Sequence, residues 1–242
     1  MRIARRGRLA LLVTVASIGT ADAREAARAL TVRAQDGVTL AATYYEASRR
    51  PAPGIILVHM LTRSKDDWQA LAPRLADAGY AVLALDLRGH GGSGGGSRTD
   101  DGRIDVSRMI LDVRAARAFF NGRPEIMAEK IGIGGASIGA NLAVLLAADD
   151  PGVRSLALLS AGLDYQGLRI EAAMRKYGDR PAFLAAGAND PYAKRSLYQL
   201  AAAGTGLRET RVLDVGGHGT VLLLRSPDLI GLLVDWFQRT LV

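Results

Sequence analysis

The sequence contains no cysteine and only three histidines in 242 residues. The missing cysteine excludes a disulfide scaffold, a thiolate zinc site and a thiol nucleophile. A metal centre built on several histidines would need almost all of His59, His90 and His218. Long apolar runs are also scarce, because the longest one near the amino terminus has about ten residues and a membrane-spanning helix needs roughly 20. The composition therefore predicts no stable membrane span.

The excess of positive charge is modest and dispersed. The net charge is +7, from 31 basic and 24 acidic residues. The first 23 residues hold four of the arginines and one aspartate, which leaves 27 basic against 23 acidic residues in the rest of the chain. Basic residues that are scattered in this way form no obvious patch for phosphate backbones. We expect no nucleic-acid partner.

The amino terminus has the three parts of an export signal. A basic segment at 2–8 is followed by an apolar run at 9–18 and by the small residues Ala21-Asp22-Ala23. This order is typical of a secretory signal peptide that is removed after Ala23. An ordinary first helix is the alternative, and the general and twin-arginine export routes both remain open. We expect residues 1–23 to be a signal peptide, residues 24–242 to be one domain, and the protein to be periplasmic or secreted.

Short apolar runs alternate with longer amphipathic stretches along the rest of the chain. The runs predict strands at 30–34, 40–46, 54–59, 81–86, 130–134, 155–160, 181–186 and 210–215. The amphipathic stretches predict helices at 66–78, 106–120, 138–148, 168–177, 193–203 and 221–241. Asp36-Gly37 favours a hairpin turn between the first two strands. The order predicts an α/β fold: a mostly parallel central sheet with an N-terminal antiparallel hairpin and helices on both faces.

One glycine-rich turn carries a candidate nucleophile. Gly135-Ala136-Ser137-Ile138-Gly139 lies between a predicted strand and a predicted helix. The pattern G-x-S-x-G in that setting is typical of a nucleophile elbow, in which the turn is so tight that larger residues would collide. A phosphate-binding turn is the alternative. However, a dinucleotide fingerprint needs a third glycine where Ser137 stands.

A serine nucleophile needs a histidine base and an acid that orients the histidine. Only His218 follows Ser137 in the sequence, and it lies in a glycine loop after the last predicted strand. Asp190 follows the predicted strand 181–186, and it can also cap the next helix. Asp164, which follows the strand 155–160, is the second candidate acid. We predict the triad Ser137, Asp190 and His218.

Together these motifs resemble those of the α/β-hydrolase superfamily. Within it, the chain is similar to the lid-free dienelactone hydrolase-like and serine esterase branch. The matching segments span about residues 54–220 and keep the family's order: 57–61, 86–93, 135–139, 187–192 and 217–219. Two positions differ, since the family usually has glycine where Met60 stands, and dienelactone hydrolases have cysteine where Ser137 stands.

The resemblance implies roles for residues that the pattern alone does not assign. The backbone amides of Leu61 and Ile138 would form an oxyanion hole, and Met60 would border the bound substrate. By the same resemblance, His59 and His90 would be structural, because the base follows the nucleophile in this family. No metal or organic cofactor is implied.

We therefore expect an exported serine hydrolase that cleaves a small-molecule carboxylic ester through an acyl-enzyme on Ser137. Only about 20 residues separate the strand 155–160 from the next one, which is too few for a lid domain. The site should be open and bordered by 91–97, Met60 and 163–170. A serine peptidase or amidase of the same fold is the first alternative. A binding protein that has lost catalysis is the second.

Overall fold

The computed structural model describes residues 27–96 and 98–241, so the expected signal peptide at 1–23 lies outside the described residues. Eight strands form one sheet in the order β1-β2-β4-β3-β5-β6-β9-β10. Their bounds are β1 Ala27–Arg33, β2 Thr39–Tyr45, β3 Ala52–Val58, β4 Ala81–Leu85, β5 Ile126–Ala136, β6 Val153–Leu159, β9 Ala182–Gly187 and β10 Arg208–Leu213. A second, two-stranded sheet pairs β7 (Asp164–Tyr165) with β8 (Leu168–Arg169).

The direction of the strands brings the chemistry-bearing loops to one edge. β1 and β2 form the expected antiparallel hairpin, and β2 also runs antiparallel to β4. All the remaining neighbours in the large sheet are parallel. The turns after β3, β5, β9 and β10 therefore leave the sheet at its carboxyl edge, where ligand sites of open α/β sheets lie.

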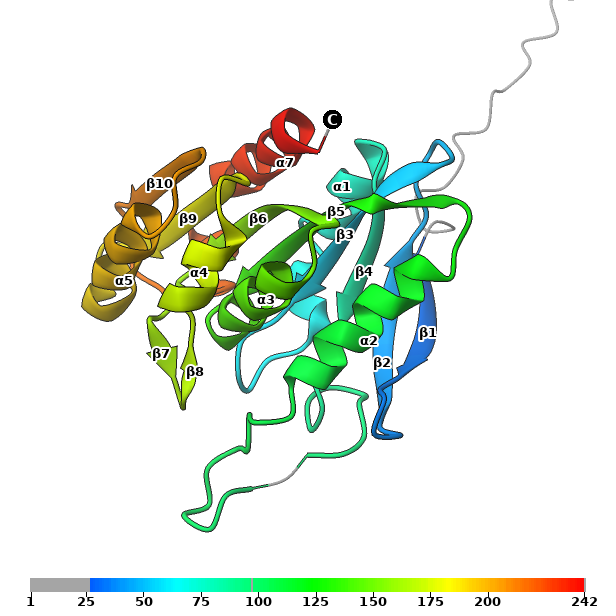
Figure 1. The fold of residues 1–242 in the computed structure, drawn as a ribbon, viewed down its shortest axis with the longest axis horizontal. Helices are drawn as coiled ribbons and strands as arrows, with labels where there is room; N and C mark the ends of the chain where they lie inside the picture. Colours follow the sequence, from blue (N-terminus) through cyan, green and yellow to red (C-terminus); the bar gives the residue numbers. More distant parts are fainter. Residues whose placement is uncertain (1–26, 97, 242) are drawn as a thin grey trace, which may run out of the picture.

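Helices cover both faces of the sheet (Figure 1). One face carries α2 (Ile110–Asn121), α3 (Ile138–Asp149), α4 (Glu171–Tyr177) and α5 (Pro191–Ala202). The other carries η2 (Lys65–Trp68), α1 (Ala72–Asp77), α6 (Val221–Arg225) and α7 (Asp228–Thr240). The central strands are buried from both sides, which explains their continuous apolar runs. The expected fold class is confirmed.

Two expected helices are wrong because each is interrupted near a proline. The stretch 66–78 forms η2 and then α1, whose first turn holds Pro73. The stretch 221–241 forms α6 and then α7, with Pro227 at the N-cap of α7 and a non-helical Ser226 before it. Proline donates no backbone hydrogen bond and disfavours a helical residue before it, so a helix starts at proline rather than continuing through it.

The segment 163–170 is the other departure from expectation. The helix expected at 168–177 begins only at Glu171, and the residues before it form the β7–β8 hairpin. The two turn residues, Gln166 and Gly167, both have positive φ, of 52° and 89°. This is typical of the tight turns whose twist matches a hairpin. Gln-Gly is a weaker turn signal than Asn-Gly, and so periodicity favoured a helix.

Candidate active site

Ser137 lies in a strained turn between β5 and α3. Its φ of 53° and ψ of −118° are unusual for a residue with a side chain. A Cβ atom on Gly135 would lie 2.5 Å from the carbonyl oxygen of Gly139, and one on Gly139 would lie 2.3 Å from that of Val58. The backbone N–H of Ser137 donates to Leu159 in β6 at 2.8 Å, which fixes the turn against the sheet. The two glycines are therefore required by close backbone approach.

A chain of two hydrogen bonds joins the three residues predicted as a triad. His218 Nε2 lies 2.7 Å from Ser137 Oγ, and His218 Nδ1 lies 2.5 Å from Asp190 Oδ2. The bond to the carboxylate places the imidazole proton on Nδ1, so Nε2 is free to accept the hydroxyl proton of Ser137. This is the geometry of a nucleophile and its oriented base.

Asp190 uses its two oxygens for two purposes. Oδ1 accepts the backbone N–H of Ala193 at 3.0 Å and so caps α5, while Oδ2 contacts His218. The sequence offered capping as the alternative to the acid role, and the geometry accommodates both. The neighbouring Asn189 accepts the N–H of Gly217 at 2.9 Å, which ties the histidine loop to the same turn.

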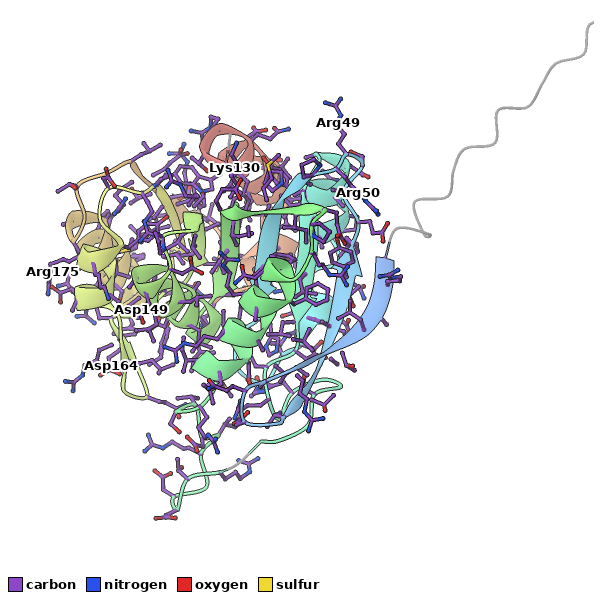
Figure 2. All side chains as sticks on the ribbon, turned by 45° about the vertical axis from the view of Figure 1, so that its right-hand side comes forward. Arg49, Arg50, Lys130, Asp149, Asp164 and Arg175 are labelled. Carbon is purple, nitrogen blue, oxygen red and sulfur yellow. The ribbon has the colours of Figure 1, made fainter. Side chains whose placement is uncertain are left out.

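Asp164, the second candidate acid, is directed elsewhere. It lies in β7, at the outer edge of the molecule in Figure 2. Its carboxylate accepts hydrogen bonds from Arg169 Nε at 3.0 Å and from the N–H of Gly167 at 2.7 Å, inside its own hairpin. The hydrogen bond from Arg169, followed by that from Gly167, lowers the pKa of Asp164. The structure thus brings Asp190 and not Asp164 to His218.

Ser160 holds the histidine loop from the other side, and sequence reasoning missed it. Its hydroxyl, which is fully buried, accepts the backbone N–H of Gly219 at 2.9 Å. Its φ is 52°, and its own N–H donates to Ala185 at 2.7 Å, so the strained residue is locked at the end of β6. A serine that follows a strand gives no signal of this role, because the contact spans 59 residues of sequence.

The two predicted oxyanion donors lie at the start of α3 and in the loop after β3. Ile138 is the first residue of α3, so its N–H has no acceptor within the helix. Leu61 follows Met60, whose carbonyl oxygen lies 2.7 Å from His59 Nδ1. In a trans peptide the C=O and N–H point in opposite directions, so the Leu61 N–H points away from His59.

His59 is a buried, neutral imidazole that fixes this loop. Its Nε2 accepts the N–H of Leu87 at 2.9 Å, and its Nδ1 therefore carries the proton that is donated to Met60. Burial lowers the pKa of His59 to about 4. The ring of His90 lies 5.1 Å from that of His59, and His90 Nδ1 contacts the carbonyl oxygen of Arg88 at 3.0 Å. Both histidines thus connect the loops that follow β3 and β4.

The neutral state of His59 predicts a loss of stability in acid. Between pH 6.5 and pH 4 the unfolded chain binds a proton at this residue and the folded chain does not, so stability falls as pH falls through this window. With a pKa of about 4 in the folded protein, we expect His59 to contribute about 3 kcal/mol to this loss. Urea unfolding of wild type and His59→Gln at pH 7 and pH 4.5 measures it. The variant should lose less free energy between the two pH values, whereas equal losses would contradict the prediction.

Met60, in the loop after β3, packs against the loop that holds His218. A Cβ atom on Gly219 would lie 2.5 Å from Met60 Sδ, so the thioether lies directly against this glycine. The φ of Gly219 is +57°. A surface depression of about 360 Å³ beside the loop is lined by Asn189, Asp190, Pro191, Gly217, His218 and Arg225. The methionine predicted to border the substrate thus lies against the residue that follows His218.

Within residues 27–96 and 98–241, no group of three or more His, Asp or Glu side chains is arranged to hold a metal ion. No helix in this same part of the chain is long and apolar enough to cross a membrane.

Tyr165 also lies close to His218 in the structure. Its ring lies 6.1 Å from the imidazole of His218 at an angle of 85°, and its hydroxyl donates to the carbonyl oxygen of Ser160 at 3.0 Å. The sequence placed 163–170 at the border of the site but singled out no residue there. Only the hairpin, which was not expected, brings the Tyr165 ring to His218.

Comparison with known proteins agrees with this fold. Residues 53–169 match the family model described as alpha/beta hydrolase fold. An uncharacterised protein of Mycobacterium tuberculosis is 30% identical over 127 residues, which cover 52% of this chain and 43% of that protein. The chain thus spans less than half the length of this curated relative.

Solved structures match over most of their length at low identity. The Pyrococcus furiosus esterase Pf2001 is 18% identical with a TM-score of 0.73, covering 93% of this chain and 98% of the esterase. A dienelactone hydrolase from Anabaena variabilis is also 18% identical, with a TM-score of 0.71, covering 89% of this chain and 98% of that enzyme. At this identity the likeness shows the fold. The resemblance expected from the motifs is confirmed at the level of the superfamily.

Proposed function

Because this chain is an α/β hydrolase by fold, we propose that it is a serine hydrolase that cleaves carboxylic esters through an acyl-enzyme on Ser137. The observation that carries the proposal is the continuous chain of hydrogen bonds from Asp190 through His218 to Ser137. An esterase and a dienelactone hydrolase among the similar structures support the same reaction class.

In the proposed reaction, each residue of the triad and each backbone amide has one role. Ser137 Oγ attacks the acyl carbon and gives its proton to His218 Nε2, which then protonates the leaving alcohol. Water then attacks the acyl-enzyme and gives its proton to His218 Nε2. The proton passes on to Ser137 Oγ as the carboxylic acid product is released. Asp190 keeps the Nδ1–H tautomer and stabilises the imidazolium. The N–H groups of Leu61 and Ile138 stabilise the tetrahedral oxyanion, a contribution of about 3–4 kcal/mol for one donor in a measured case elsewhere.

Esters are expected to be much better substrates than amides. The proposed triad and two amide donors suffice for a good leaving group, but peptide cleavage also needs groups that grip the chain. Between β6 and β9 the described chain has only the β7–β8 hairpin and α4, which offer little remote binding energy to lower the barrier. We expect kcat/KM for short-chain 4-nitrophenyl esters to exceed that for the matching 4-nitroanilides by more than about a hundredfold. Comparable values would favour a peptidase or amidase.

A fluorophosphonate probe tests the proposal directly. Covalent labelling of the wild type and its absence in Ser137→Ala are expected, because the probe reacts only with an activated serine. A protein that neither reacts with the probe nor hydrolyses any member of an ester panel would instead be a binding protein on this fold.

A further inference from the structure

Strand β10 has one unpaired side, at the end of the large sheet. It is the last strand in the sheet order and lies beside α5 at the outer end of the sheet (Figure 1). The carbonyl oxygens of Leu207 and Leu213 accept N–H groups from the first residue of β9 and from the residue after its last, at 3.0 and 2.8 Å. Backbone groups alternate in direction along a strand, so the N–H and C=O groups of Arg208, Thr210 and Val212 point outward. Within the described residues, no strand pairs with this outer side.

The side chains of β10 leave this edge accessible. Edge strands often resist pairing by directing a positive charge outward. The Arg208 guanidinium is instead folded back onto its own chain, where it donates to the carbonyl oxygens of Arg180 and Gly178, both at 2.6 Å. Apolar side chains lie exposed at both ends of the strand, since Leu207 is 53% and Val212 37% exposed. An open edge with these features can accept a further strand.

We propose that β10 pairs with β10 of a second copy of this chain, in an antiparallel arrangement with two-fold symmetry centred on Thr210. In this register Thr210 lies opposite Thr210 of the second copy, and Arg208 lies opposite Val212. Each of the outward-facing residues then belongs to a hydrogen-bonded pair, in which both N–H···O bonds are exchanged. The sheet continues from one copy into the other.

The charges of β10 select this register. Glu209 and Arg211 lie on the face of the sheet that carries α7, where Arg239 donates to Glu209 Oε2 at 3.0 Å. Centring on Thr210 puts Glu209 of each copy directly opposite Arg211 of the other, in the closer, non-hydrogen-bonded kind of pair. The two neighbouring registers that keep the outward groups paired put Glu209 opposite Glu209, or Arg211 opposite Arg211. Like charges directly opposite each other are destabilising, so both alternatives are disfavoured.

Helix α5 brings an aromatic side chain to the same boundary. Ser196 in α5 accepts the N–H of Leu163, which follows β6, so the Ser196 flank faces the middle of the sheet. Tyr198 is 59% exposed and lies about 200° around the helix from Ser196, on the flank toward β10. With strands about 4.8 Å apart, the two-fold axis places the two α5 helices roughly 10 Å from each other, which is a normal helix-packing distance. Tyr198 of each copy then faces the interface, where tyrosine is enriched.

This pairing leaves both candidate active sites open. The two β10 strands run in opposite directions, so the carboxyl edges of the two sheets lie at opposite ends of the dimer. Each chain keeps its own Ser137, Asp190 and His218, and the second copy supplies no residue to them. The dimer is therefore independent of the proposed function.

Sedimentation velocity of the purified protein with two charge reversals tests the proposal. We expect the wild type to be a dimer at tens of micromolar. Glu209→Arg and Arg211→Glu should each weaken dimerisation by at least about thirtyfold, because both cross-strand pairs become like-charged. An equal mixture of the two variants should form a dimer again, since opposite charges then meet at both pairs. This recovery distinguishes the proposed register from a general loss of folding.

Glu171→Arg is the matched control for the charge change. It removes an ion pair of the same kind, with Arg175 at 2.5 Å, on α4 and away from β10, so the variant should remain dimeric. Thr210→Pro provides a second test, because it removes only an outward N–H and keeps the ladder with β9. We expect a monomer whose thermal midpoint is close to that of the wild type.

Three outcomes would overturn the inference. The first is a wild type that stays monomeric up to about 100 µM, which is below the affinity range of specific interfaces. The second is wild-type dimerisation in Glu209→Arg and Thr210→Pro, which would place the contact on another surface. The third is a mixture of the two charge variants that stays monomeric, which would exclude the register centred on Thr210.

Discussion

Replacement of Ser137 by alanine is expected to lower kcat for ester hydrolysis by on the order of 10⁴- to 10⁶-fold. His218→Ala should lose a similar amount, because the hydroxyl that lies 2.7 Å from Nε2 is a weak nucleophile without a base. The double variant should be no worse than either single variant, since the two residues act as a unit. Initial rates with a 4-nitrophenyl ester measure all three.

A control separates chemistry from folding. Ser48→Ala removes the hydroxyl of an exposed serine and should leave both kcat and the thermal midpoint unchanged. The thermal midpoint of Ser137→Ala should also stay close to that of the wild type, because alanine keeps the Cβ atom of the strained turn. Losses that add in the double variant would place one of the two residues outside the mechanism.

Asp190→Asn is expected to lower kcat by on the order of 10³- to 10⁴-fold, because an amide at this position stabilises the wrong imidazole tautomer. The side-chain oxygen of asparagine can still accept the N–H of Ala193, so the cap of α5 is retained. The substitution therefore tests the contact with His218 with little cost to the helix. Steady-state kinetics and the thermal midpoint together distinguish the two effects.

Asp164→Asn is the paired comparison for this result. Asp164 is half-exposed and bonds within its own hairpin, so we expect less than about a twofold change in kcat. The opposite ranking of the two variants would assign the acid role to Asp164. Equal, small effects of both would show that the imidazole needs no carboxylate.

The residues of the candidate triad could be found from the sequence because each follows a strand of a parallel sheet. Such strands end at the same edge, so the turns that hold Ser137, Asp190 and His218 had to lie close together. The elbow also has a steric signature, in which Gly135 and Gly139 leave no room for a Cβ atom. In this fold the histidine follows the nucleophile in the chain, and only His218 follows Ser137. That order left His218 as the candidate base.

The supporting residues could not be found because their partners are distant in sequence. Ser160 contacts Gly219 and Tyr165 contacts His218, and both contacts depend on how the loops fold over the sheet. The helix interruptions before Pro73 and Pro227 are a different kind of error. Both prolines were visible, but apolar periodicity continued across them and outweighed the backbone rule.

The turn of the β7–β8 hairpin is a natural point for chain growth. Gln166 and Gly167 are exposed. The base of the hairpin is held by the side chain of Asn141 in α3, which donates to the carbonyl oxygens of Gly162 and Leu168, both at 2.8 Å. The hydrogen bond from Ile170 N–H to the Leu163 carbonyl at 3.1 Å also closes this base. Each doubling of a flexible loop costs only ~0.6 kcal/mol in closure entropy. Residues inserted at the turn would lengthen the hairpin beside the loop at 99–107 and leave the sheet and the His218 loop unchanged. Insertions between Gln166 and Gly167 can therefore vary this surface while the rest of the fold is kept.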